Sequence, residues 1–203
     1  MVREFIYYSA TGVTSPNLIK DDLMKAGRID IACQFILQSL FVSREIRPDT
    51  KVHLILNGPP DSPKHLEIFP GKNLEGIENK IDISKKDIAG LIRRMLYKYK
   101  KGEKIEVVPG YTVEKKSFVK LLEELHGEGK EIYILDKRGE DIRDIKISDN
   151  PVFIVGDHEG IPKNEMKWAK HIPMKKISVG PYMLFASQVV TLIHNEVDRS
   201  SLS

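Results

Sequence analysis

Short apolar strands that end at glycine-containing turns are the feature that most constrains the fold of this chain. Residues 151–155 form an apolar run that stops at Gly156, and residues 176–179 form a second run that stops at Gly180. A third run, 132–135, leads into a polar stretch. In open α/β sheets, ligands bind beyond the carboxyl ends of the strands. The sequence therefore predicts a ligand pocket with these loops as its walls.

Strand-like and helix-like segments alternate along almost the whole chain. Strands are predicted over residues 4–8, 51–56, 66–69, 105–108, 132–135, 151–155 and 176–179. Apolar residues at helical spacing predict helices over 32–41, 85–100, 115–126, 163–170 and 184–197, with one or two further turns at 18–24. This alternation predicts an α/β fold, a mostly parallel sheet flanked by helices. A chain of 203 residues is expected to form a single domain, 1–203.

Local signals set the expected ends of several elements. Asp30 is the predicted N-cap of the first long helix, and Ser84 is the predicted N-cap of the helix that follows it. Residues 71–80 and 136–140 are expected to be loops.

The charge of the chain is mildly basic, with a formal net charge of +3. This value is compatible with binding RNA but does not establish it, because charges of both signs alternate along most of the chain. The most basic local run lies on one side of the predicted helix 85–100 and just after it. Two interpretations of that run remain open, a solvated helix face and a contact with an RNA backbone. Its members are Arg93, Arg94, Lys98, Lys100 and Lys101.

Several classes of site are excluded or disfavoured. Cys33 is the one cysteine, so the chain forms no internal disulfide and no cysteine-based metal site. The six histidines include no H-E-x-x-H pair, and we expect no metal. No run approaches the roughly 20 apolar residues of a membrane span, and the first residues lack a signal-peptide core. We therefore expect a soluble cytoplasmic protein.

The common nucleotide-binding motifs also fail. Gly71 and Gly76 have the spacing of a P-loop, but Ile77 stands where the P-loop lysine belongs. The glycines of residues 127–129 precede a strand, so they end a helix and do not form a dinucleotide-binding turn. An NTPase or a simple Rossmann enzyme is therefore disfavoured.

Polar and aromatic residues near the predicted strand ends are candidates for catalysis or substrate binding. Asp157 either faces the reacting groups or bonds to the backbone of its own turn. Tyr182 either contacts a substrate base or packs against the protein. Arg28, Asp30, Asn57 and Asp61 are candidate substrate contacts, although Asp30 as a simple helix cap is an equally good interpretation.

Four segments carry a resemblance to a known family: residues 27–30 (G-R-I-D), 132–141 (I-Y-I-L-D-K-R-G-E-D), 151–158 (P-V-F-I-V-G-D-H) and 177–195 (I-S-V-G-P-Y-M-L-F-A-S-Q-V-V-T-L-I-H-N). With them the chain resembles the archaeal tRNA pseudouridine N1-methyltransferases, members of the SPOUT superfamily of knotted methyltransferases. The resemblance spans nearly all residues, and it is looser over 57–115. The last two segments together are its most specific part.

The resemblance implies a SPOUT-type fold with a deep trefoil knot over about residues 130–198, a homodimer, and S-adenosylmethionine as cofactor. It implies a tRNA substrate that is methylated on N1 of the pseudouridine at position 54 of the T-loop. Two alternatives remain: methylation of ribosomal RNA or of another uridine position, and a knotted RNA-binding module that has lost catalysis.

The resemblance also implies which residues contact the cofactor. The wall of the pocket is expected to combine strand-end residues with the loop before the last helix: Leu135, Gly156, Val179, Gly180, Pro181, Tyr182, Met183, Leu184 and Val189. The family often has a cysteine at the position of Val189, so a catalytic cysteine at this position is excluded. The predicted catalytic residues are Tyr182 and Asp157.

Overall fold

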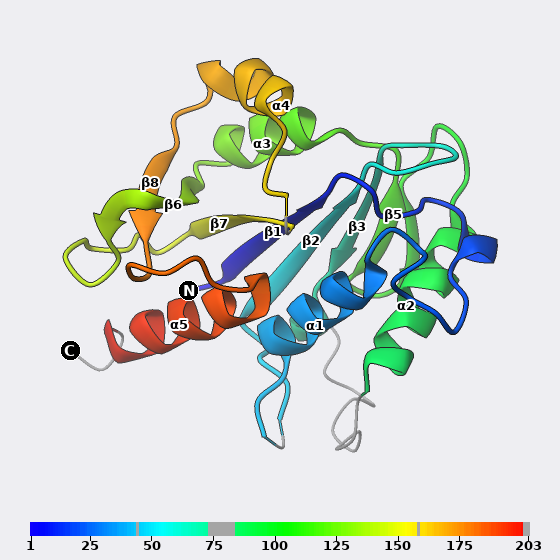
Figure 1. The fold of residues 1–203 in the computed structure, drawn as a ribbon, viewed down its shortest axis with the longest axis horizontal. Coiled ribbons are helices and arrows are strands. Elements are labelled where there is room, and N and C mark those ends of the chain that lie inside the picture. Colours follow the sequence, from blue (N-terminus) through cyan, green and yellow to red (C-terminus); the bar gives the residue numbers. More distant parts are fainter. Residues whose placement is uncertain (44, 73–83, 158, 201–203) are drawn as a thin grey trace.

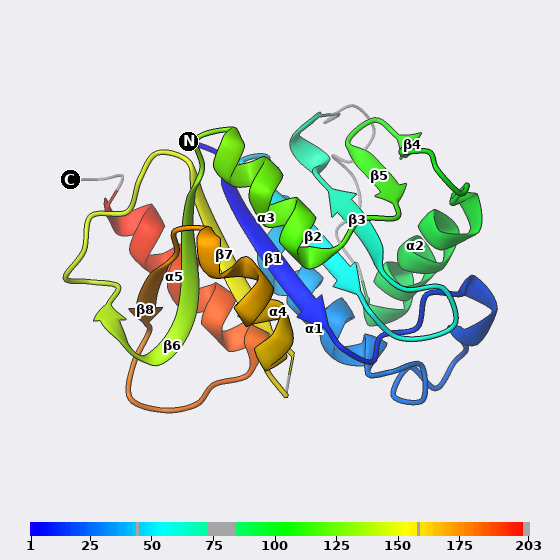
Figure 2. The same ribbon diagram turned by 90° about the horizontal axis from the view of Figure 1, so that it is seen from above.

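The computed structural model describes residues 1–43, 45–72, 84–157 and 159–200. Within these residues, eight strands form one sheet in the order β4-β5-β3-β2-β1-β7-β6-β8 (Figures 1 and 2). The strands are β1 (Arg3–Ser9), β2 (Thr50–Leu56), β3 (Lys64–Ile68), β4 (Ile105–Val108), β5 (Tyr111–Glu114), β6 (Glu131–Asp141), β7 (Pro151–Gly156) and β8 (Lys175–Ser178). The helices are α1 (Ile29–Leu40), α2 (Lys85–Lys98), α3 (Phe118–Gly127), α4 (Lys163–Trp168) and α5 (Ala186–Ser200), with 3-10 helices η1 (Pro16–Leu18), η2 (Pro70–Lys72) and η3 (Ala169–His171).

Five neighbouring strands run parallel, which confirms the predicted α/β architecture. β1 pairs in parallel with β2 and β7, and β6 pairs in parallel with β7 and β8. The antiparallel strands β3, β5 and β4 extend the sheet beyond β2. Because β1, β2, β7, β6 and β8 share one direction, the loops that follow them leave from one edge of the sheet, which we call the carboxyl edge.

Helices cover both faces of the sheet. α1, α2 and α5 lie on one face, while α3 and α4 lie on the other (Figure 1). Successive side chains of each strand point to opposite faces of the sheet, so they pack alternately against one helix layer and the other. Phe5 and Tyr7 of β1 belong to the core under α1 and α5, and Ile6 and Tyr8 belong to the core under α3.

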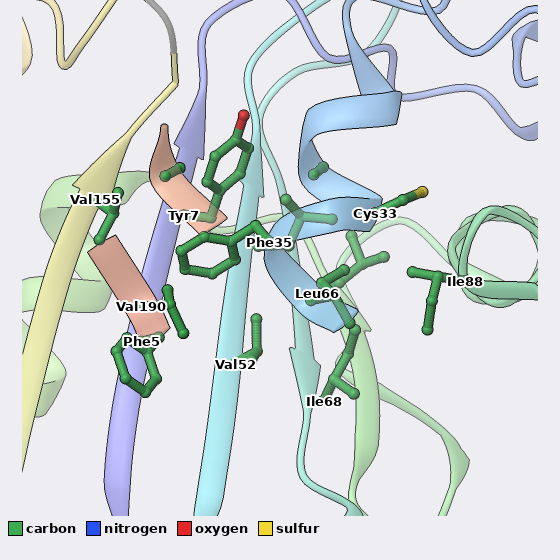
Figure 3. Close-up of a cluster of buried hydrophobic side chains, with 14 of the residues drawn as sticks. Phe5, Tyr7, Cys33, Phe35, Val52, Leu66, Ile68, Ile88, Val155 and Val190 are labelled. Atoms are coloured by element: carbon green, nitrogen blue, oxygen red, sulfur yellow. The ribbon is translucent and has the colours of Figure 1, made fainter. Parts of the chain in front are cut away.

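The larger core packs aromatic side chains of the central strands against α1 and α5. Phe5 stacks on Phe153 with ring centroids 5.5 Å apart, and Phe35 of α1 contacts Tyr7 at 4.9 Å (Figure 3). Val190 of α5 and Val155 of β7 belong to the same cluster. This core fixes the carboxyl end of β7 relative to the start of α5.

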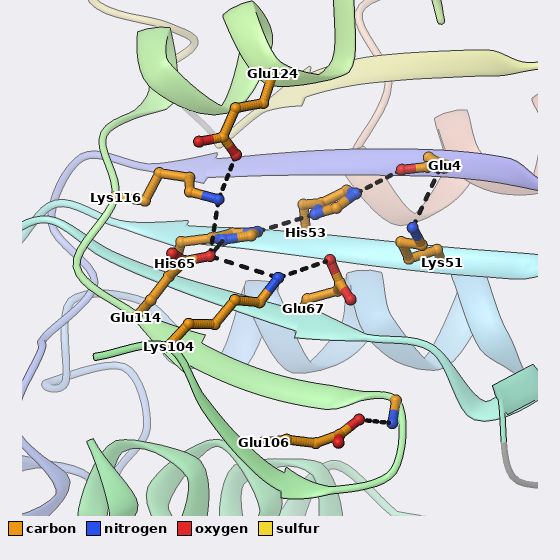
Figure 4. A network of polar contacts seen from close by, with 11 residues as sticks. Glu4, Lys51, His53, His65, Glu67, Lys104, Glu106, Glu114, Lys116 and Glu124 are labelled. Atoms are coloured by element: carbon orange, nitrogen blue, oxygen red, sulfur yellow. Dashed lines mark hydrogen bonds and ion pairs between the residues drawn. The ribbon is translucent and has the colours of Figure 1, made fainter. Parts of the chain in front are cut away.

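The other face of the sheet contains a buried polar chain (Figure 4). His53 Nε2 lies 2.7 Å from Glu4, His53 Nδ1 lies 2.9 Å from His65 Nε2, and His65 Nδ1 lies 3.2 Å from Glu114. Contacts with His53, Lys51 and Lys130 outweigh burial and hold the pKa of Glu4 at about 2. Burial lowers the pKa of His65 to about 4, so Glu114 faces a neutral imidazole at neutral pH.

The Glu114 carboxylate at the end of this chain has a second partner. Lys116 Nζ lies 2.8 Å from the Glu114 oxygen that His65 contacts, and it also pairs with Glu124. Contacts with His65 and Lys116 outweigh burial and hold the pKa of Glu114 at about 2.

Several predicted boundaries differ from the structure. Residues 136–140, expected as a loop, belong to β6, and residues 111–114 form a strand that was not predicted. The helical turns expected over 18–24 are not present: the 3-10 turn η1 lies before them at Pro16–Leu18, and residues 23–27 form a non-helical turn. The helix expected from residue 115 begins at Phe118 because Ser117 caps it by accepting from Lys120 N. Of the predicted loop 71–80, residues 73–80 lie outside the described residues.

The two predicted helix caps have opposite outcomes. Ser84 forms a capping box with Asp87, which confirms it as the N-cap of α2. Asp30 is not the N-cap of α1, because it lies within the first turn and Arg28 occupies the cap with φ 62. The Asp30 carboxylate instead pairs with the Arg28 side chain.

Candidate functional site

The end of β6 and the turn after β8 enclose a cavity of about 490 Å³ at the carboxyl edge. Volumes of this order are typical of small-molecule pockets. One wall is the bend of β6, the other is the loop that leads from β8 into α5. The lining residues are Leu135, Asp136, Lys137, Arg138, Lys176, Ile177, Ser178, Val179, Gly180, Tyr182, Met183, Leu184 and Val189.

The predicted cofactor residues converge on this cavity. All of them line it except Gly156 and Pro181. Gly156 lines an adjoining cavity of about 380 Å³, which shares Leu135, Asp136 and Lys176 with the first. Lys176 Nζ donates to Asp136 at 2.9 Å, so this ion pair belongs to the wall common to both cavities.

Sequence reasoning missed the charged residues of the cavity. Asp136, Lys137, Arg138 and Lys176 were assigned only to a loop and a strand, yet all four line it. Backbone N–H of Arg138 and the Lys176 ammonium lower the pKa of Asp136. For Asp136, Lys137 and Arg138, the signal that could have found them is their position directly after the predicted strand 132–135, whereas Lys176 begins a predicted strand and gives no such signal.

The bend of β6 depends on a close approach of two strands. Ile177 of β8 pairs with both Leu135 and Glu140, so residues 136–139 bulge out between them. A Cβ on Gly139 would lie 2.5 Å from the backbone of Ile177. Glycine at 139 therefore permits the bulge that forms one wall of the cavity.

Gly156 allows the next turn to close. A Cβ at this position would lie 2.7 Å from the Gly160 Cα, and Gly160 itself has φ +77. Asp157 and Gly160 form an isolated bridge across the turn. A larger side chain at 156 would therefore distort the turn before it reached the cavity.

The two predicted catalytic residues lie in different surroundings. Asp157 accepts a hydrogen bond from Ala10 N at 3.0 Å and one from Glu159 N at 2.9 Å. These bonds tie the turn after β7 to the loop after β1. Tyr182 is 78% exposed and lines the mouth of the larger cavity. Its ring is therefore available to a ligand that approaches from solvent.

Arg28 and Asp30 form a bidentate ion pair with N···O distances of 3.0 and 3.1 Å. Arg28 has a left-handed backbone, which is uncommon for a residue with a side chain. The preceding Gly27 is also left-handed, and a Cβ there would lie 1.8 Å from Thr11 O. The loops after β1 and before α1 are therefore packed backbone to backbone, and the guanidinium is held at the carboxyl edge.

Tyr7 lies beneath this region with its hydroxyl buried and without a hydrogen-bond partner among the described residues. Burial, followed by the charges of Asp157 and Asp30, raises its pKa. The charges of Asp157, Asp30 and Arg28 therefore all influence the pKa of this one buried hydroxyl.

Asn57 and Asp61 are not brought together with the cavity residues. Asn57 donates to the Tyr8 hydroxyl at 2.9 Å. Asp61 accepts from Lys64 at 2.6 Å and also pairs with Lys115, which lowers the Asp61 pKa to about 2. Both residues lie between β2 and β3, and neither lines a described cavity at the bend of β6.

The part of the chain that the structure describes has neither a metal-binding cluster nor a membrane-spanning helix. Among these residues, no three His, Cys, Asp or Glu side chains gather closely enough to hold a metal ion. No helix within the described ranges combines the length and the apolar character needed to cross a membrane.

Comparison with solved structures identifies the class of fold. The chain superposes over its full length on the crystal structure of Archaeoglobus fulgidus Nep1 bound to S-adenosylhomocysteine, with a TM-score of 0.65 and 14% sequence identity. Each chain is covered completely. At this identity the likeness shows the fold alone.

Sequence comparison identifies the family. The profile described as "Putative SAM-dependent RNA methyltransferase" matches residues 2–202, and the chain belongs to this family. It is 33% identical to the tRNA (pseudouridine(54)-N(1))-methyltransferase of Methanocaldococcus jannaschii, over 99% of this chain and 98% of that one. It is 36% identical to a "Putative pseudouridine methyltransferase" of Vibrio cholerae, over 98% of both chains. The protein is thus an S-adenosylmethionine-dependent RNA methyltransferase.

Proposed function

We propose that this protein methylates N1 of the pseudouridine at position 54 in the T-loop of tRNA. The proposal rests on one observation above all, the cavity at the carboxyl edge, whose walls are the segments predicted to hold a cofactor. The substrate assignment is based on relatives that are called tRNA (pseudouridine(54)-N(1))-methyltransferases. One of them, from Methanococcoides burtonii, is 32% identical to this chain.

The residues of the cavity fit S-adenosylmethionine. Leu135, Leu184 and Val189 supply an apolar wall for an adenine ring. The loop 178–184 supplies backbone amides and carbonyls, and the Ser178 hydroxyl bonds to both the N–H and the carbonyl of Gly180 and so holds the loop open. Asp136 and Lys176 add one carboxylate and one ammonium, which match the charged ends of an amino acid.

Methyl transfer from S-adenosylmethionine requires few side-chain groups. Bound S-adenosylmethionine supplies a methyl group on a positively charged sulfur, already activated for transfer. The protein must hold the ring nitrogen in line with that methyl group, and such positioning can lower a barrier by roughly 7–11 kcal/mol. It must also accept the proton that the ring N–H loses, a contribution of about 100- to 10,000-fold.

Residues at the carboxyl edge are assigned to these tasks. Tyr182, exposed at the mouth of the cavity, stacks on the target base. The Asp157 carboxylate, oriented by two backbone amides, accepts the hydrogen bond of the ring N–H. Arg28, oriented by Asp30, binds a phosphate beside the target nucleotide. Asn57 and Asp61 are kept as more distant candidates for contact with the RNA.

The knot and the dimer are part of the same proposal. β6 meets Ile177 on both sides of its bulge, and α5 then crosses to pack along α1, a path compatible with a trefoil knot over about 130–198. Tyr182, Met183 and Phe185 are exposed side by side in the chain, which suits a homodimer contact beside the cavity. A tRNA substrate places the protein in the cytoplasm.

Methyl transfer to defined transcripts tests the proposed function. We expect transfer from labelled S-adenosylmethionine to a tRNA that carries pseudouridine at the T-loop site, and none to the same tRNA with uridine there. Equal transfer to both transcripts, or transfer only to ribosomal RNA, would contradict the substrate assignment. If calorimetry detects no binding of S-adenosylmethionine, the enzyme assignment is wrong and the alternative of a non-catalytic RNA-binding module is favoured.

A further inference from the structure

A second concave surface lies at the other end of the sheet, away from the cofactor cavity. Two adjoining cavities of about 770 and 450 Å³ lie between the segment around η1 and helix α2. They share Ile19, Lys20, Asp21, Gly90 and Arg93. We call this surface the η1–α2 groove; its remaining lining includes Lys85, Lys86, Arg94 and Tyr97.

The groove is strongly cationic. Lys20, Lys85, Lys86, Arg93 and Arg94 are all exposed, against the single carboxylate of Asp21. None of these five cations forms an ion pair with another residue in the described ranges, whereas nearby Lys25 and Arg28 are paired with Asp22 and Asp30. Charges without internal partners in a concave surface attract a polyanion.

The spread of the charges indicates a polymer. Lys85 and Arg93 are eight residues apart on one helix, a separation of about 12 Å along its axis. One phosphate group cannot reach both, but successive phosphates of a nucleic acid backbone can. Tyr97, at the end of the same face, is 75% exposed and offers a flat ring on which a base can stack.

Gly90 leaves part of the α2 backbone uncovered in the groove. It lies inside α2, where glycine is less favourable than alanine by roughly 0.5–1 kcal/mol. A Cβ at this position would meet nothing within 4 Å, so packing within the described protein does not require glycine here. Gly90 lines both parts of the groove. A glycine in an open groove floor lets a ligand approach the helix backbone closely.

The groove is connected to the proposed active site through one loop. Residues 10–28 follow β1 at the carboxyl edge, and they contain both η1 with Lys20 and the Gly27-Arg28 turn. In Figure 2 this loop and the loop before α5 lie along the same edge of the sheet. A ligand that reaches both the cavity and the groove must extend along that edge.

We propose that the η1–α2 groove binds the sugar–phosphate backbone of the substrate RNA outside the target nucleotide, with one base stacked on Tyr97. The inference rests on the proposed function, since it assumes an RNA substrate. The groove supplies affinity that does not depend on sequence, while the carboxyl-edge cavity supplies the chemistry.

Affinity for tRNA, measured by fluorescence anisotropy without cofactor, tests the groove directly. Arg93→Glu and Arg94→Glu are each expected to weaken binding at least tenfold and to lower the salt dependence of log K by about 1–2. The matched control is Lys72→Glu, an equal charge change at the opposite edge of the sheet, where β3 ends beside the start of β2. It should change affinity less than twofold. Equal losses in all three variants would overturn the groove as the binding surface.

Two further variants separate contact from folding. Gly90→Gln places a good helix former in α2, so Tm should stay level or rise while tRNA affinity falls at least fivefold. Tyr97→Ala should weaken binding about tenfold and Tyr97→Phe should restore it, since stacking needs only the ring. Wild-type tRNA affinity in Gly90→Gln, or equal losses in both Tyr97 variants, would overturn these contacts.

The failure of this inference differs from a failure of the proposed function. All groove variants should bind S-adenosylmethionine in calorimetry as the wild type does, and should recover methyl transfer at saturating tRNA. A wild-type protein that binds tRNA through the groove but methylates no pseudouridine would overturn the proposed function alone. A wild-type protein that methylates tRNA while the groove variants keep full affinity would overturn the groove alone.

Discussion

Val189 and Val190 are adjacent in α5 but face different surroundings. Both belong to the large core, but Val189, at 8% exposure, also lines the carboxyl-edge cavity, whereas Val190 is completely buried in the cluster that contains Val155 (Figure 3). A change in size should therefore act on ligand binding only at the first position and mainly on folding at the second. This difference makes the two residues a matched pair.

Val189→Phe is expected to fill the cavity and to weaken binding of S-adenosylmethionine at least tenfold, with a smaller loss of unfolding free energy than Val190→Phe, because its side chain borders open space. Val190→Phe should instead overpack the core and lower that free energy by about 1–3 kcal/mol. Calorimetric titration and thermal unfolding of both variants check the prediction. Unchanged cofactor affinity in Val189→Phe would show that the cofactor binds elsewhere.

Helix α5 is held to the rest of the molecule by a buried histidine. His194 Nε2 donates to Ser39 O at 3.0 Å, so its Nδ1 is free to accept from Arg3 at 3.2 Å. Burial, followed by the charges of Arg47 and Arg3, lowers the pKa of His194 to about 4, although the hydrogen bond to Ser39 and the charge of Asp198 oppose this shift. The folded protein therefore keeps this imidazole neutral where the unfolded chain protonates it.

The free energy of unfolding should consequently fall as pH is lowered from about 6.5 to about 4, because the unfolded state binds a proton there that the folded state does not. For His194 alone the loss is up to about 3 kcal/mol, and His65 adds to it in the same window. His194→Gln should flatten the curve, measured by urea unfolding at a series of pH values. His171→Gln, at an exposed position on η3, should leave it unchanged.

Elements with strong local signals were predictable from sequence. Ser84 capped its helix as expected, and the apolar runs of β1, β2 and β7 became buried strands. The shape of β6 was not predictable, because its bulge is imposed by pairing with Ile177, some forty residues later. For the same reason, spacing in the sequence gave no sign that Lys176 pairs with Asp136.

The candidate site divides along the same line. Residues directly beyond strand ends, such as Leu135, Gly180 and Val189, could be assigned to the pocket and do line it. Residues whose role depends on a partner could not be assigned. Asp61 looks like a loop residue open to a ligand, yet Lys64, three residues later, and the distant Lys115 both pair with its carboxylate.

At the scale of the whole molecule, exposed apolar residues gather beside the carboxyl-edge cavity. Met183 and Phe185 are 85% and 76% exposed, and they flank a loop whose inner side forms the cavity wall. A second copy of the chain that covered them would also fix the position of that loop. The proposed dimer would thus support the pocket in each subunit.

Phe185→Asp should convert the dimer to a monomer and weaken cofactor binding, as measured by sedimentation velocity and calorimetry. Phe185 O accepts from Gln188 N and Val189 N at the start of α5, and aspartate is a favoured residue at such a position, so the helix should form normally. Trp168→Asp, at an exposed apolar residue on α4, is the control and should stay dimeric. A wild-type monomer, or a dimeric Phe185→Asp, would contradict the proposed interface.

The place of β1 in the sheet has a consequence for how the protein is made. Glu4 of β1 pairs with Lys51 of β2 on one side and with Val152 of β7 on the other. As the chain leaves the ribosome, β1 can pair with β2 early on one edge. Its other edge stays unpaired until β7, in the last quarter of the polypeptide, has been synthesised. An unpaired apolar edge invites association with other chains, and pairing over such a distance folds slowly. The nascent protein should therefore depend on chaperones until β7 is synthesised, and its cofactor pocket is completed only when translation is nearly over.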